Sequence, residues 1–180
     1  MTKKTVELGF FLTFALILSY VESLIPFSFG IPGIKLGLPN LIVVLLLCRG
    51  AEEKNRSGRQ RFAGCADALL VNVLRIILSG FLFSGMYTVL YALTGAFFSF
   101  AAMLAGRRTG CFSVLGISVL GGVFHNIGQI LVAMFVVETV YVGYYIPFLI
   151  VSGTVTGAVL GIAALEVIPY LRRHENRGED

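Results

Sequence analysis

Charged residues are scarce in this sequence. They make up 13% of the 180 residues, whereas hydrophobic residues make up 57%, and a soluble domain usually contains about a quarter charged residues. The few charges are clustered, so they leave apolar stretches close to the roughly 20 residues that span a bilayer as a helix. The composition therefore excludes an ordinary soluble domain and predicts an integral membrane protein.

Motifs for nucleotide and metal chemistry are missing as well. No Gly-rich loop followed by Lys-Ser/Thr occurs, which excludes ATP binding by that motif. The three cysteines show no metal spacing, and we interpret them as free thiols packed as small hydrophobes. Adjacent acidic residues occur at 52–53 and 179–180, in polar segments, whereas magnesium-dependent prenyl diphosphate chemistry needs aspartate clusters that face a cavity. We therefore expect no enzyme activity and no cofactor or metal.

Six apolar stretches are candidates for transmembrane helices. We place them at residues 6–25, 37–48, 62–80, 86–105, 112–137 and 145–168. Residues 1–171 then form a single domain, and residues 172–180 form a charged tail without a fold of its own. The second stretch is short for a span, so part of the Gly/Pro-rich segment before it must lie at membrane depth. Non-helical backbone is tolerated there only where protein or water covers it.

The basic residues predict how the helices are oriented. Apart from Lys35 and Arg75, every lysine and arginine lies near the N-terminus, after the second or fourth stretch, or in the C-terminal tail. All these segments fall on one side if both termini are cytoplasmic, which satisfies the positive-inside rule. The net charge of +4 therefore indicates topology in the cell membrane and does not point to nucleic acid. Residues 1–25 lack a small-x-small cleavage site, so we interpret them as a retained helix and not as a signal peptide.

Small residues recur along the sixth stretch. Gly153, Gly157 and Gly161 follow one another at a spacing of four, which lets the backbone of another helix approach closely. Two interpretations are open: packing inside the bundle, which is the simpler, and docking of a partner membrane subunit.

Polar side chains inside apolar stretches are costly in a membrane and are therefore candidates for function. The candidates for substrate binding are Glu22, Lys35, Asn40, Asn72, Arg75, His125, Asn126 and Gln129. With both termini inside, most of them lie in the outer half of the bundle, with Lys35 and Asn40 facing Arg75. Two cations and several amides around an outward-facing cavity would suit a small, polar, anionic ligand.

Structural roles are alternatives for the same residues. Arg75 could pair with Glu22 or extend toward the interface. His125 could be a hydrogen-bonded core residue, and Asn126 and Gln129 could join helices through hydrogen bonds.

Residues 32–40, Pro-Gly-Ile-Lys-Leu-Gly-Leu-Pro-Asn, resemble the family called Gx transporters, which is also labelled heptaprenyl diphosphate synthase component I. The resemblance continues through Glu22-Ser23-Leu24-Ile25-Pro26, through Asn72-Val73-Leu74-Arg75, and through Gly121-Gly122-Val123-Phe124-His125-Asn126. It thus covers most of the chain. Pro39 departs from the small residue expected before the asparagine.

The resemblance implies a compact bundle of six transmembrane helices, similar to the substrate-binding S components of energy-coupling-factor importers. Such components capture vitamins or related micronutrients near the outer face, and they depend on a transmembrane coupling subunit and two ATPases. We therefore expect an importer subunit that contacts a small-molecule substrate and the lipid bilayer. The alternatives are a membrane accessory component of heptaprenyl diphosphate synthesis and a proton-coupled solo transporter that uses His125 and Glu22.

Overall fold

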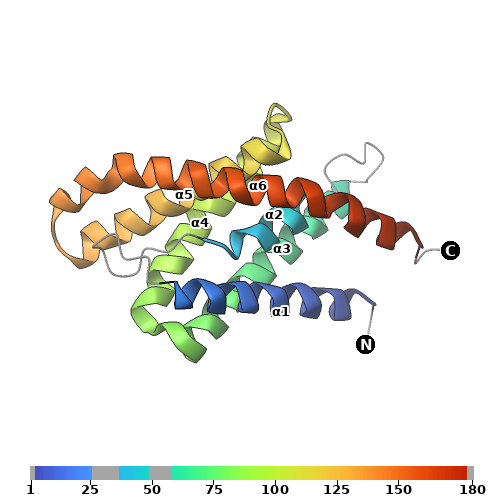
Figure 1. Ribbon diagram of the computed structural model, residues 1–180, viewed down its shortest axis with the longest axis horizontal. Coiled ribbons are helices and arrows are strands. Elements are labelled where there is room, and N and C mark those ends of the chain that lie inside the picture. The colour runs from blue at the N-terminus through green and yellow to red at the C-terminus, as the bar shows by residue number, and fades with distance from the viewer. Residues whose placement is uncertain (1–2, 26–36, 49–57, 178–180) are drawn as a thin grey trace.

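A computed structural model of the protein describes residues 3–25, 37–48 and 58–177. Within these ranges the regular structure is entirely helical, as predicted. The long elements are α1 (Lys3–Leu24), α2 (Asn40–Cys48), α3 (Gly58–Ser79), α4 (Met86–Thr109), α5 (Val114–Val136) and α6 (Ile146–Arg177). A π-helical turn η1 (Gly80–Ser84) follows α3, and a 3₁₀ turn η2 (Val140–Tyr145) precedes α6. In Figure 1, α1 begins and α6 ends on the same side of the bundle.

Five helical segments are long and apolar enough to cross a membrane. They are Lys3–Leu24, Gly64–Phe83, Met86–Thr109, Val114–Val136 and Val140–Leu171. The chain is thus a multi-pass membrane protein. The predicted second span differs from the others, because α2 has 9 residues and is about 14 Å long at 1.5 Å per residue. That is roughly half of the ~30 Å hydrocarbon core, so α2 does not cross the bilayer alone.

Helix α2 occupies the centre of the bundle. Every residue from Ile42 to Cys48 is at most 4% exposed, and the helix contacts α1, α3, α5 and α6. Figure 1 shows it between α1 and the α5/α6 pair. Phe11, Met103 and Ala164 belong to the same core cluster, together with residues from α3 and α5. A helix that is apolar on all sides is stable when other helices surround it, which accounts for the interior position of α2.

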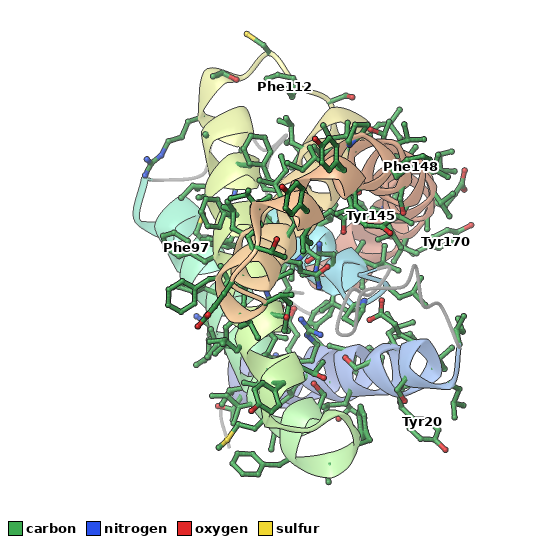
Figure 2. All side chains as sticks on the ribbon, turned by 90° about the vertical axis from the view of Figure 1, so that its left-hand side faces the viewer. Tyr20, Phe97, Phe112, Tyr145, Phe148 and Tyr170 are labelled. Atoms are coloured by element: carbon green, nitrogen blue, oxygen red, sulfur yellow. The ribbon has the colours of Figure 1, made fainter. Side chains whose placement is uncertain are left out.

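The outer surface of the bundle is apolar. Phe81, Met86 and Phe135 are at least 80% exposed, and the labelled side chains of Phe97 and Tyr170 lie at the periphery in Figure 2. Large apolar surfaces of this extent are rare on soluble monomers. Because polar side chains are buried at the same time, the distribution is the one expected of a protein whose outside faces lipid.

Glycines allow α5 and α6 to approach backbone to backbone. A β-carbon on Gly153 would lie 2.7 Å from the carbonyl oxygen of Gly122, and one on Gly157 would lie 2.7 Å from the α-carbon of Val119. A β-carbon on Gly161 would lie 3.0 Å from the α-carbon of Leu115 on α5. Gly153, Gly157 and Gly161 therefore pack against α5 inside the bundle, which is the first of the two interpretations given above.

The observed helix ends lie within four residues of the predicted ones, with a single exception. Helix α6 continues to Arg177, whereas the sequence pattern predicts an end at residue 168 and a tail without a fold from 172. Its membrane-spanning segment ends at Leu171, so the charged residues beyond prolong the helix outside the apolar stretch. At the end of α4, Gly110 adopts a left-handed conformation with φ +69°, a common way for a helix to stop.

Candidate functional site

The polar residues predicted for the site are buried. Lys35 lies outside the residues that the structure describes. The other seven are between 1% and 7% exposed: Glu22, Asn40, Asn72, Arg75, His125, Asn126 and Gln129. Apart from Asn126, these residues form, together with Ser19 and Ser99, what we call the polar cluster.

Arg75 is the buried cation of this cluster. Its Nη1 donates a hydrogen bond to the Ser19 hydroxyl at 3.2 Å, and its Nη2 donates to the Asn72 side-chain oxygen at 2.9 Å. Asn72 precedes Arg75 by three residues on α3, a spacing that places both on one face of the helix. The guanidinium Nε has no hydrogen-bond partner among the described residues. Arg75 is therefore held through both of its Nη atoms, while its Nε–H has no acceptor among the described residues.

Glu22 fastens the end of α1 to the start of α2. Its Oε1 accepts hydrogen bonds from the backbone N–H groups of Gly37 and Leu38, the latter at 3.3 Å. A carboxylate is favourable near a helix N-terminus because unpaired N–H groups and the helix dipole meet it there. Gly37 has φ +82°, a conformation that costs little only for glycine. Glu22 also interacts electrostatically with Arg75 and so offsets its buried charge.

The imidazole of His125 lies near Gly37, just before α2, and Gly95 of α4. A β-carbon on Gly95 would lie 2.9 Å from the ring, and one on Gly37 would lie 3.7 Å from it. One turn further along α5, Gln129 Nε2 lies 3.2 Å from His125 Nε2. Arg75 is close enough to interact electrostatically with His125. The ring thus neighbours Gln129 on its own helix and lies within electrostatic range of Arg75 on α3.

Asn40 and Ser99 complete the cluster on α2 and α4. The Asn40 amide Nδ2 donates to the Ser99 hydroxyl at 3.4 Å, and it borders Gly37 on the side that His125 also borders. The sequence predicts that Asn40 faces Arg75. In the structure the Asn40 side chain instead bonds to Ser99 on α4.

Asn126 has a different environment from the cluster. Its Nδ2 donates to the backbone carbonyl of Leu149 at 2.8 Å, which ties α5 to the first turns of α6. This is the helix-joining role considered above as an alternative.

Ser19 and Ser99 contribute to the cluster but are absent from the candidates predicted from the sequence. Ser19 precedes Glu22 by three residues and therefore lies on the same face of α1, which is a usable signal. Ser99 has no comparable signal, because a serine in an apolar helix can satisfy its own hydroxyl with the backbone.

Two buried polar atoms of the cluster have no hydrogen-bond partner within the described ranges: Arg75 Nε and Gln129 Oε1. His125 Nδ1 is within hydrogen-bonding reach of the Gly95 backbone. Most buried polar atoms in folded proteins do have a partner, so two in one cluster require an explanation. In the part of the chain that the structure describes, no group of three or more His, Cys, Asp or Glu residues could hold a metal. The groups present are a guanidinium, a carboxylate, amides, an imidazole and hydroxyls, which can recognise a polar solute.

A bundle of apolar helices that encloses a charged and amide-rich interior defines a polytopic membrane protein with a buried polar site. The chain belongs to the family described as heptaprenyl diphosphate synthase component I, whose family model matches residues 11–167. This confirms the family that the motif at residues 32–40 and its companion motifs indicate. The matched range contains the whole polar cluster. No curated protein and no solved structure matches the chain.

Proposed function

We propose that this chain is the substrate-binding subunit of an energy-coupling-factor type importer and that it binds a small anionic metabolite at the polar cluster. The observation that carries the proposal is the state of Arg75. The side chain is 7% exposed, Ser19 and Asn72 fix its orientation, and its Nε has no partner among the residues described.

A buried cation in this position costs desolvation free energy, which its role in recognition would explain. Charged side chains within a membrane protein are rare and are mostly functional. Glu22 offsets the charge, but its Oε1 also accepts from two backbone N–H groups. Guanidinium groups bind carboxylates and phosphates through short, charge-assisted hydrogen bonds. An anionic solute would therefore supply the acceptor that Nε lacks.

The distribution of charge supports access from outside. Within the described residues, the α1 and α3 members of the polar cluster lie toward the C-terminal ends of those helices, and Asn40 lies at the start of α2. Lys4, in the first turn of α1, forms an ion pair of 2.9 Å with Asp67 in the N-terminal half of α3. Arg107 and Arg108 lie in the last turn of α4. Under the positive-inside rule the basic side is cytoplasmic, so the proposal places the polar cluster in the outer half of the cell membrane.

Transport against a gradient would need energy from other chains. The 180 residues contain no phosphate-binding loop motif, and we propose that a transmembrane coupling subunit and two ATPases supply the energy. The chain itself then has no enzyme activity. An affinity-tagged copy, purified in mild detergent from its native membranes, should bring these three partner subunits with it. Proteoliposomes that contain the complete assembly should then take up metabolite only when ATP is present.

The family description favours a second candidate, a membrane accessory subunit of heptaprenyl diphosphate synthesis. In that case prenyltransferase activity of a soluble catalytic partner would depend on this chain. Purification of the tagged chain with a prenyltransferase in place of ATPases, together with activity that is lost when the chain is removed, would replace the importer proposal.

A further inference from the structure

Two atoms of opposite hydrogen-bonding character remain unpaired in the polar cluster. Arg75 Nε can only donate a hydrogen bond, and an amide oxygen such as Gln129 Oε1 can only accept one. Both are buried and have no partner in the described part of the chain, and the Gln129 side chain belongs to a residue that is 1% exposed. A solute that satisfied both atoms would need an acceptor and a donor.

The contact between Gln129 and His125 determines which end of the amide is left over. Gln129 Nε2 lies 3.2 Å from His125 Nε2. An amide nitrogen has no lone pair to offer, so it must donate, and the imidazole Nε2 must accept. The imidazole is therefore neutral and carries its proton on Nδ1, which lies against the backbone of Gly95. The same contact orients the amide so that its oxygen is the group without a partner.

Arg75 and Gln129 are linked through residues that both of them neighbour. Arg75 interacts electrostatically with Glu22 and with His125. Glu22 is bonded to the N–H of Gly37, and Gly37 borders the imidazole that Gln129 holds. The donor on α3 and the acceptor on α5 thus share His125 as a common neighbour.

We infer that the ligand of this site carries two groups: an anionic oxygen group that accepts from Arg75 Nε, and an N–H or O–H group that donates to Gln129 Oε1. This deepens the proposed function and rests on it. The chemical class is that of small hydroxy acids, amide-bearing acids and carboxylates of N–H heterocycles. A site built to hydrogen-bond an N–H group rejects an analogue without it, because the protein acceptor would stay buried and unpaired.

Matched carboxylates that differ only in this donor test the inference. Pyrrole-2-carboxylate and furan-2-carboxylate form one pair, and indole-2-carboxylate and benzofuran-2-carboxylate form a larger pair. Within each pair the charge is equal and the shape nearly so, but a ring N–H replaces a ring oxygen. Isothermal titration of the purified full chain in detergent should show tighter binding of the N–H member by at least about tenfold in one or both pairs.

Variants assign that preference to named side chains. Gln129→Met should reduce the preference to less than about twofold, whereas Gln129→Glu retains an oxygen acceptor and should keep it. Arg75→Gln should weaken both members of a pair by more than about tenfold. Ser118→Ala is the matched control. Like Gln129, Ser118 lies on α5, is buried and has a polar atom without a partner among the described residues. It packs against Gly157 of α6, which is not part of the polar cluster. Ser118→Ala should leave the affinities for both members of a pair unchanged.

The outcomes separate the inference from the proposed function. The inference would be overturned by equal affinity for both members of each pair, by a preference that survives Gln129→Met, or by a preference that is lost in Gln129→Glu. In any of these cases the importer proposal would stand if binding still depended on Arg75. Absence of binding for all four carboxylates, or binding indifferent to Arg75→Gln, would overturn both.

Discussion

Arg75 on α3 donates a hydrogen bond to Ser19 on α1 across 3.2 Å, and the Ser19 hydroxyl in turn donates to the Ala15 carbonyl of its own helix at 2.9 Å. A serine inside an apolar helix thus serves as an acceptor for a buried guanidinium. Since α1 packs mainly on α3, this contact links the polar cluster to the packing of the first helix.

Loss of the Ser19 hydroxyl should destabilise the protein. In Ser19→Ala a buried charged donor is left without its acceptor, which should cost about 1–3 kcal/mol of unfolding free energy. Thermal unfolding in detergent, followed by circular dichroism, measures the change. Ser23→Ala is the control, because Ser23 is exposed and bonds to the Tyr20 carbonyl of its own helix. Equal shifts in the two variants would show that the Arg75 contact is unimportant.

Glu22→Gln should strengthen anion binding. The substituted amide keeps an oxygen that can accept from the Gly37 and Leu38 N–H groups, but it removes the negative charge that interacts with Arg75. Less repulsion between this position and a bound anion should tighten carboxylate binding by about threefold to tenfold. Titration with pyrrole-2-carboxylate gives the affinity. Weaker binding in the variant would mean that Glu22 contacts the ligand as an acceptor or orients Arg75 through its charge.

A methyl group at Gly157 should separate α5 from α6. A β-carbon there would lie 2.7 Å from the Val119 α-carbon and 2.8 Å from the Ser118 carbonyl oxygen. Overpacking against backbone, which cannot move aside as a flexible side chain would, typically costs about 1–3 kcal/mol. Gly9→Ala provides the comparison, since a β-carbon at Gly9 meets nothing within 4 Å. The melting temperature should fall in Gly157→Ala and stay the same or rise in Gly9→Ala; a similar result for both would contradict the packing.

Asn126→Leu should affect stability but not recognition. The substitution removes the 2.8 Å hydrogen bond to the Leu149 carbonyl, which keeps its intrahelical partner in α6, so the loss should cost about 0.5–1.5 kcal/mol. The melting temperature should therefore fall, while the monodisperse fraction should bind pyrrole-2-carboxylate within about twofold of the unaltered protein. A selective loss of binding with unchanged stability would return Asn126 to the substrate site.

Much of the fold follows from local pattern in the sequence. Long apolar stretches bounded by charged or Gly-rich segments predict the helices and most of their ends, because both features act within a few residues. The interior position of α2 could not be predicted this way. Its residues are as apolar as those of a lipid-facing helix, and only its neighbours decide which environment it meets.

The candidate site was predictable in part. Polar residues are rare in these helices, so Arg75, His125 and Gln129 stand out by type, and their burial follows from the cost of exposing them to lipid. Which partner each one takes depends on how the helices pack. Asn126 and Gln129 are three residues apart on α5, yet one bonds to α6 and the other contacts His125. Nothing in their spacing distinguishes these outcomes.

The most direct test of anion binding at Arg75 is native mass spectrometry of the protein purified in mild detergent from its own membranes. The unaltered protein should carry a small acidic molecule, identifiable after release. Arg75→Ala should lose it by more than about tenfold, because the buried positive charge and its donors are gone, and Arg75→Lys should recover it only partly, since lysine keeps the charge without the planar set of donors. Equal occupancy in Arg75→Ala would contradict the account.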